Sequence, residues 1–187
     1  MLMNKSLRRT LANEAGVTVM EMLGVLIVVG ILGTMGAYGF SKLTEWLDET
    51  RYMDDVKYII SGVKSQYRSQ PANTRYGTAV ISSSSLINAK AAPDGAISGT
   101  SLVNPFSGQY VVTGANSTFY VDGDNIPKES CIAILTKLSS GSFTSAVQVA
   151  ATQASVASAT STAVPVSLTT ADGACATALN AIRLTAK

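Results

Sequence analysis

A run of uncharged residues, 22–40, lies near the N-terminus of this 187-residue chain and restricts the possible folds more than any other feature. At about 1.5 Å per residue, a helix of this length matches the hydrocarbon thickness of a bilayer. Lys5, Arg8 and Arg9 precede the run and favour a cytoplasmic N-terminus. The sequence therefore predicts a transmembrane helix over residues 22–40.

A helical pattern continues beyond the uncharged run, because apolar residues recur every three or four positions. These are Leu43, Trp46, Leu47, Met53, Val56, Ile60, Val63 and Tyr67. Charged residues occupy many of the positions between them, which is typical of a helix with one buried face. Pro71 ends the pattern, since proline disfavours helix in the residue before it and has no amide hydrogen. We expect one long helix over residues 17–70 and a globular head over residues 71–187.

The head has short segments separated by glycine, proline and asparagine, which indicates strands and turns. We expect strands at residues 110–113, 118–121, 143–150 and within 163–169, a hairpin connection at 114–117, and a short helix at 127–138. The tract from 139 to 170 is rich in serine, threonine, alanine and valine, and it is compatible with either strand or loop.

The composition argues against catalysis, because the chain contains no histidine, the commonest general base and metal ligand. The residues Asp122 to Asn125 resemble part of a calcium loop, but the glutamate expected later in such a loop is replaced by Ala133, so a turn is the better interpretation. We expect no catalytic residue, no metal site and no cofactor.

Net charge also restricts the partners. The chain has 14 basic and 12 acidic side chains. Lys5, Arg8, Arg9 and Glu14 all lie in the first sixteen residues, so the remainder carries equal numbers of the two signs. A nucleic-acid partner would require a basic face, and none is expected here.

The two cysteines, Cys131 and Cys175, would form a disulfide in an exported protein and two buried thiols in a cytosolic one. The N-terminal anchor indicates export, so we expect the bridge. Closing a loop of this length stabilises a fold by about 3 to 4 kcal/mol in the chain-entropy model.

The segment Gly16-Val17-Thr18-Val19-Met20-Glu21, followed by the uncharged run, resembles the processing site of type IV prepilins. This resemblance implies that a prepilin peptidase removes residues 1–16 by cutting after Gly16, and that the new amine of Val17 is methylated. Valine at this position, where the better-known subclass has phenylalanine, and the longer leader favour the type IVb subclass.

Glu21 has a physical role in this interpretation, because a carboxylate at the edge of an apolar helix is costly in lipid and usually has a partner. The resemblance implies that Glu21 of one subunit pairs with the Val17 amine of its neighbour and sets the axial register. The alternative is that Glu21 only favours the positive end of its own helix.

Five glycines in the apolar helix also leave two interpretations open. They could line a face for close helix–helix packing, or they could reflect the relaxed composition of a lipid-facing anchor. They are Gly24, Gly30, Gly33, Gly36 and Gly39.

Two segments of the head extend the resemblance. Residues 104–108, Asn-Pro-Phe-Ser-Gly, are similar to the Asn-Pro-Phe-Gly-Gly turn of type IVb pilins, with Ser107 in place of a glycine. Residues 126–131 are similar to their Ile-Pro segment before the first cysteine. The resemblance implies an α+β ladle fold, in which the long helix packs on an antiparallel sheet of the head.

The function implied is that of a major pilin, a structural subunit that forms a helical filament with copies of itself. Its other partners would be the prepilin peptidase, the inner-membrane assembly machinery and, before assembly, the membrane. It would reside in the inner membrane as a precursor and then in an extracellular pilus that supports adhesion, aggregation or conjugative mating contact. The alternatives are a minor pilin, a type II secretion pseudopilin, or a membrane-tethered periplasmic domain that retains residues 1–16.

Overall fold

The computed structural model describes residues 19–138 and 143–187. The chain divides into two units, Met1–Thr44 and Glu45–Lys187, and one helix, α2 (Val19–Gln66), contributes to both. The helix ends four residues before the predicted limit of residue 70. Hydrogen-bonded turns follow it, with the Gln70 amide donating to the Tyr67 carbonyl. The predicted start at residue 17 lies outside the described residues.

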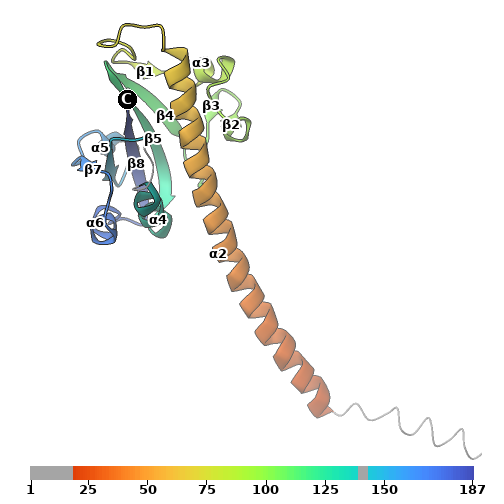
Figure 1. The fold of residues 1–187 in the computed structure, drawn as a ribbon. Coiled ribbons are helices and arrows are strands. Elements are labelled where there is room, and N and C mark those ends of the chain that lie inside the picture. The colour runs from red at the N-terminus through yellow and green to blue at the C-terminus, as the bar shows by residue number, and fades with distance from the viewer. Residues whose placement is uncertain (1–18, 139–142) are drawn as a thin grey trace, which may run out of the picture. The chain divides into compact units, whose positions relative to one another are not determined.

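The unit Glu45–Lys187 combines short helices with two sheets (Figure 1). The strands are β1 (Val80–Ile81), β2 (Ile97–Ser98), β3 (Ser101–Leu102), β4 (Tyr110–Ala115), β5 (Thr118–Pro127), β6 (Ala146–Ala150), β7 (Thr162–Ala163) and β8 (Leu179–Ala186). The helices after α2 are α3 (Ser83–Asn88), the 3₁₀ turn η1 (Asp94–Ala96), α4 (Lys128–Leu138), α5 (Gln153–Val156) and α6 (Leu168–Ala174).

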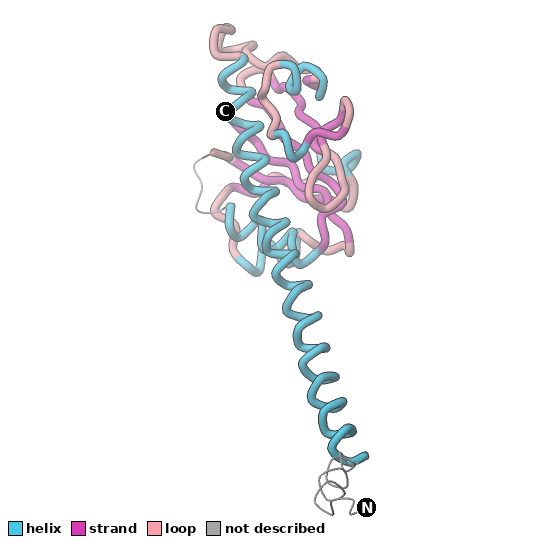
Figure 2. Tube along the Cα trace, turned by 90° about the vertical axis from the view of Figure 1, so that its right-hand side faces the viewer, coloured by secondary structure: helices cyan, strands magenta, loops and turns pink. Residues whose placement is uncertain are grey.

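The larger sheet is antiparallel and has the order β1-β4-β5-β8-β6-β7. Its centre is the pair β5 and β8, so the last strand of the chain lies between β5 and β6 (Figure 1). Figure 2 shows the strands of this unit in magenta. β2 and β3 form a separate two-stranded sheet. The fold is therefore α+β, as predicted.

The core forms where the second half of α2 lies across one face of the sheet (Figure 1). Tyr52, Val56 and Ile59 from the helix are fully buried, as are Phe119 of β5 and Leu184 of β8. Tyr52 packs on Tyr110 of β4 with 5.5 Å between ring centroids. Burial of this helix face stabilises the unit through the hydrophobic effect.

Several local predictions are confirmed. β4 and β5 contain the strands expected at 110–113 and 118–121, and the chain between them reverses at Asn116 and Ser117. Asn116 adopts a φ of 59°, a left-handed conformation that asparagine tolerates. The helix expected at 127–138 is α4, and β6 forms the later part of the strand expected at 143–150.

Two predictions are wrong. The strand expected within residues 163–169 stops at Ala163, because Pro165 cannot donate to a ladder, and Ser167 then caps α6 by accepting from the Thr170 amide. Asp122 to Asn125 do not form a turn but belong to β5, whose pairing with β8 is irregular between Gly123 and Ile126. Pairing with β8, which the sequence analysis missed, explains the longer strand.

Candidate assembly surface

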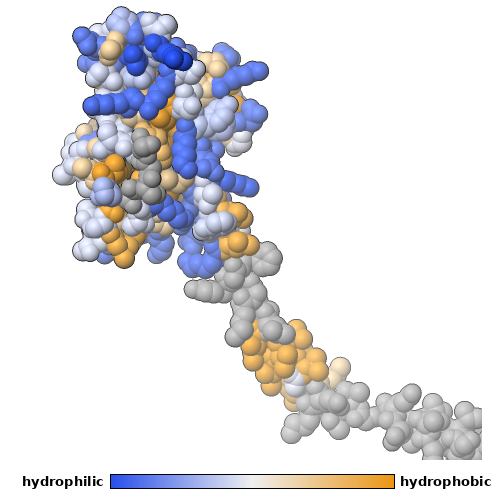
Figure 3. All heavy atoms as spheres, in the orientation of Figure 1, coloured by the Kyte–Doolittle hydropathy of each residue, from blue (hydrophilic) through white to orange (hydrophobic). Residues whose placement is uncertain are grey.

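The first unit presents an apolar helix surface whose described side chains are exposed. The large apolar side chains of residues 22–31 are all between 50% and 66% exposed. They are Met22, Leu23, Val25, Leu26, Ile27, Val28, Val29 and Ile31. Figure 3 shows hydrophobic surface over this segment. A helix that is apolar all round requires lipid or other helices as its neighbours.

Gly24 and Gly30 belong to this surface. An added Cβ atom at either position would meet nothing within 4 Å, so packing within the chain does not require glycine there. Small residues on an apolar helix allow another helix to approach closely, which favours the packing interpretation. The side chains at the positions of Gly33, Gly36 and Gly39 lie outside the described residues.

The predicted processing residues cannot be placed in the same way. Gly16 and Val17 lie outside the described residues, and Glu21 belongs to α2 but its side chain is not described. Cleavage after Gly16, methylation of Val17 and pairing through Glu21 therefore stay predictions.

Among the described residues, no helix is both long and apolar enough to cross a membrane. The predicted span of 22–40 includes residues 32–40, whose side chains lie outside that set.

The second half of α2 is one-sided, but its buried face starts later than predicted. Met53, Val56, Ile60 and Val63 are buried in the core as expected. Trp46 and Leu47, assigned to the same stripe, are 53% and 40% exposed, and Leu43 is exposed as well. Periodicity identifies a helix face, but it does not show how far the head covers that face. It also missed Tyr52 and Ile59, which are fully buried.

Polar contacts fix α2 against the head. Lys137 of α4 donates to Glu49 Oε2 at 2.6 Å, and Tyr110 Oη donates to Asp55 Oδ2 at 3.4 Å. Burial raises the pKa of the Asp55 carboxyl above its usual value, although the hydrogen bond from Tyr110 opposes the shift. Burial also raises the pKa of Tyr110. These contacts orient the helix and offer no nucleophile with an adjacent base.

A charged pair joins the two central strands. Arg183 of β8 donates from Nε and Nη2 to the two carboxylate oxygens of Asp122 in β5, at 2.7 and 2.6 Å. The side chains are only 12% and 3% exposed. The hydrogen bonds to Asp122 raise the pKa of Arg183. The bidentate geometry occupies both carboxylate oxygens, so Asp122 serves as a cross-strand partner.

The segment that resembles the pilin Asn-Pro-Phe turn is built around Asn104, which is only 3% exposed. Its Oδ1 accepts from the amides of Phe106 and Gly108, and its Nδ2 donates to the Asp124 carbonyl at 2.7 Å. Ser107 adopts a φ of 64°, a conformation that favours glycine. Asn104 therefore attaches the turn to β5.

The structure contains a disulfide between Cys131 of α4 and Cys175, the residue that follows α6. The bridge joins residues 44 positions apart and both cysteines are fully buried. It ties the segment before β8 to the helix that follows β5.

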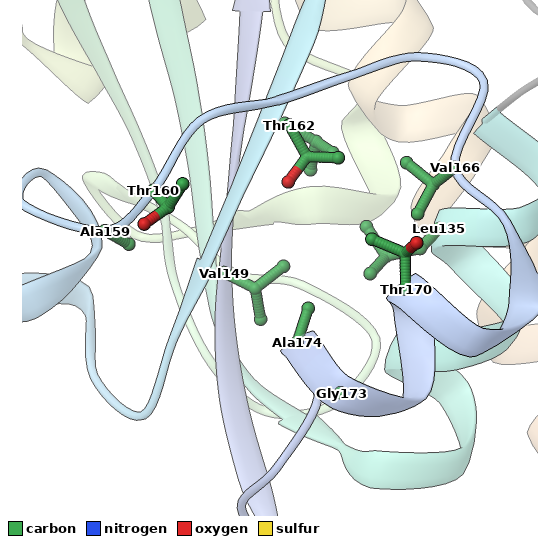
Figure 4. Close-up of a pocket in the computed structure, with 10 residues that line it drawn as sticks. Leu135, Val149, Ala159, Thr160, Thr162, Val166, Thr170, Gly173 and Ala174 are labelled. Atoms are coloured by element: carbon green, nitrogen blue, oxygen red, sulfur yellow. The ribbon is translucent and has the colours of Figure 1, made fainter.

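A pocket of about 350 Å³ lies between β6, α4 and α6, beneath the segment 159–166 (Figure 4). Its walls are aliphatic, with threonine hydroxyls, and include Leu135, Val149, Thr162, Val166 and Thr170. No lining residue is charged. Within the described part of the chain, no three acidic or cysteine side chains come together as a metal site would require.

Comparisons with known proteins identify the family. The family model described as PilS N terminal matches residues 48–187, more than half of the chain. A crystal structure of a type IVb pilin from Salmonella typhi aligns with a TM-score of 0.53 at 19% identity, over 74% of this chain and 96% of the other. TcpA, a type IV pilin from Vibrio cholerae of the El Tor biotype, aligns with a TM-score of 0.52 at 15% identity, over 75% and 99%.

No curated protein matches the chain significantly in sequence. At these identities the two structures establish the fold, an N-terminal helix packed on an antiparallel sheet, and the family model establishes the relationship. The chain belongs to the PilS family and is a type IV pilin of the type IVb subclass.

Proposed function

We propose that this chain is the major subunit of a type IVb pilus, made as a prepilin and assembled into a helical filament through the N-terminal half of α2. The exposed apolar surface between Met22 and Ile31 carries the proposal, because many copies could bury it against one another. Membership of a pilin family supports a structural role rather than an enzymatic one.

The precursor resides in the inner membrane, with residues 1–16 on the cytoplasmic side. Prepilin peptidase removes the leader after Gly16, and the Val17 amine is methylated. The amine then gives Glu21 of an incoming subunit a positive partner. Since a carboxylate in an apolar environment is costly without a partner, this pairing favours one axial register.

Assembly transfers the apolar helix from lipid to the filament core with the help of the inner-membrane machinery. Helix contacts replace lipid contacts, and the uncovered surface of Gly24 and Gly30 supports close approach. The finished filament is extracellular, and it serves adhesion, aggregation or conjugative mating contact.

Intact-mass analysis of filaments sheared from cells tests the processing. We expect the mature chain to begin at Val17 and to carry one methyl group. An exported chain that retains residues 1–16 would contradict the proposal and would favour a membrane-tethered periplasmic domain.

Substitution and copy number test the assembly. Glu21→Ala should abolish filaments while the processed subunit remains in the membrane, whereas Asp94→Ala, at an exposed acid of the head, should assemble normally. Quantitative mass spectrometry should find this chain as the main filament component. A trace amount would instead indicate a minor pilin or a pseudopilin.

A further inference from the structure

A short apolar patch lies on α2 beyond the uncharged run of residues 22–40. It consists of Leu43, Trp46 and Leu47, whose side chains are all exposed. Trp46 and Leu47 follow Leu43 by three and four residues, the spacing that makes side chains neighbours on a helix surface. We call these three residues the Trp46 patch. Figure 3 shows hydrophobic surface at the end of the head from which α2 continues towards its N-terminus.

The exposed side of α2 changes in character after this patch. Exposed residues of the following turns include the charged residues Arg51, Asp54 and Lys57. Beyond Leu47, the only exposed large hydrophobic residue on the described part of α2 is Tyr58, which also carries a hydroxyl group. The boundary between apolar and charged exposed surface therefore lies just past Leu47 on this part of the helix.

The position of Trp46 along the helix matches the depth of lipid headgroups. The uncharged run ends at residue 40, and Trp46 lies about 9 Å further along the helix at 1.5 Å per residue. A helical side chain also points back towards the N-terminus, which brings the indole ring closer to the run. The headgroup layer on each side of a bilayer is about 5 to 8 Å thick. A helix whose run fills the hydrocarbon therefore places this ring at the headgroup layer.

The chemistry of the patch fits that layer as well. Tryptophan is enriched at membrane–water interfaces, because its ring is largely apolar while its indole N–H donates to water or headgroup oxygens. Leu43 and Leu47 add apolar surface that would otherwise face water. Lys42 and Glu45, the only charged residues between the run and Trp46, have opposite signs, so no net charge there opposes approach to anionic lipid.

We propose that, before assembly, the Trp46 patch binds the lipid headgroup layer on the side of the inner membrane that faces the head, and that it fixes the depth of α2. The inference rests on the proposed function, in which the precursor resides in that membrane. Continuity selects lipid as the occupant, because α2 carries both surfaces and a helix held in the membrane through residues 22–40 brings the patch to the membrane surface.

The patch has a role that the leader cannot fill. Lys5, Arg8 and Arg9 favour the cytoplasmic side at the other end of the helix, but cleavage after Gly16 removes them. The Trp46 patch stays on the mature chain. It therefore holds the processed subunit at one depth until the assembly machinery extracts it.

Fluorescence of the single tryptophan in lipid vesicles tests the placement. The full chain is reconstituted in vesicles of phosphatidylethanolamine and phosphatidylglycerol. These contain a lipid with a nitroxide quencher, either on the headgroup or near the end of the acyl chain. Trp46 should lose more of its emission to the headgroup quencher than to the chain-end quencher, because its ring lies at the headgroup layer.

Two variants move the reporter along the same helix and serve as controls. Trp46→Phe combined with Tyr58→Trp places the ring about 18 Å further from the run, at another exposed position, and the headgroup quencher should affect it far less. Trp46→Phe combined with Ile31→Trp places the ring in the middle of the run, where the chain-end quencher should be the stronger one.

The outcomes separate this inference from the proposed function. No quenching of Trp46, or equal quenching of Trp46 and of the Tyr58→Trp reporter, would overturn the inference while a quenched Ile31→Trp reporter still supports a membrane-inserted precursor. An Ile31→Trp reporter that neither lipid quenches would instead contradict the proposed function. If lipid leaves Trp46 unquenched but iodide quenches it less in sheared filaments than in detergent-solubilised subunits, a second copy of the chain is the occupant and the inference is wrong.

Discussion

At the scale of single residues, the closest approach between helix and sheet occurs at Gly123. An added Cβ atom there would lie 2.4 Å from Tyr52 Oη and 2.8 Å from its Cε2. Tyr52 is fully buried between α2 and β4, so its ring has no free space into which it can retreat. Glycine at this position sets how closely α2 lies on β5.

Gly123→Ala should therefore destabilise the head by about 1 to 3 kcal/mol, the usual cost of overpacking a core. Urea unfolding of the full chain in detergent, followed by tyrosine fluorescence or circular dichroism, measures the change. Gly173→Ala is the matched control, because an added Cβ there meets nothing within 4 Å and alanine favours the helix α6. Equal stability of the two variants would show that Tyr52 adapts.

Asp55 makes the stability of the head depend on pH. Burial raises the pKa of this carboxyl from 3.8, so the folded state holds the proton more tightly than the unfolded state does. The resulting stabilisation is fully present below 3.8 and is lost as pH rises through the folded pKa.

Asp55→Asn should remove this pH-dependent loss of stability and keep a side-chain oxygen that accepts from Tyr110 Oη. The variant should therefore gain stability relative to the wild type as pH rises from about 3.8 towards neutrality. Denaturant unfolding of both proteins across this range provides the test. A difference between them that does not change with pH would contradict the shift.

At the scale of elements, the pairing of β5 with β8 depends on a charged contact. Asp122 and Arg183 are direct cross-strand partners, and both side chains are largely buried. Removing one member leaves the other without its partner in a poorly solvated site, whereas replacing both with apolar side chains removes the two charges together.

Asp122→Leu should cost about 3 to 5 kcal/mol, and the double variant Asp122→Leu with Arg183→Leu should cost less than either Asp122→Leu or Arg183→Leu alone. A double-mutant cycle based on urea unfolding measures the coupling. Additive effects of the two substitutions would mean that the pair is not energetically linked.

The same two strands show where sequence reasoning succeeds and fails. The hairpin from β4 to β5 was predictable because a turn-favouring Gly-Ala-Asn-Ser segment separates two runs of β-branched and aromatic residues. β8 was not, since Leu179–Ala186 contains alanine, leucine and arginine, which favour helix, and becomes a strand only through pairing on both sides. Tertiary context overrides its local propensity.

The candidate assembly surface was likewise predictable only in part. The apolar run predicts a helix that requires external partners, and its exposed residues agree with that prediction. Periodicity alone could not show that Trp46 stays exposed, because this depends on where the head begins to cover α2.

At the scale of the whole molecule, the positions of the two cysteines along the chain determine which elements the disulfide encloses. Cys131 follows β5 and Cys175 precedes β8, so the bridge encloses β6, β7, α5 and α6 in one loop next to the two central strands. This enclosed region is assembled from short elements, one of which, β7, has only two residues, and from small side chains. It therefore has less apolar surface to hold it in place than the contact between α2 and the sheet.

Replacing both cysteines with alanine should lower the free energy of unfolding of the head by about 3 to 4 kcal/mol, through the greater freedom of the unfolded chain. Urea unfolding of the variant should agree with that of the wild type in reductant, which controls for the change in side chains. Hydrogen exchange should then report faster opening in residues 143–175 than in β4 and β5, since only the former lose their covalent closure. Uniformly faster hydrogen exchange across the sheet would instead show that the bridge stabilises the head as one cooperative unit. In that case filaments of the variant should dissociate more readily, because every head in them is less stable.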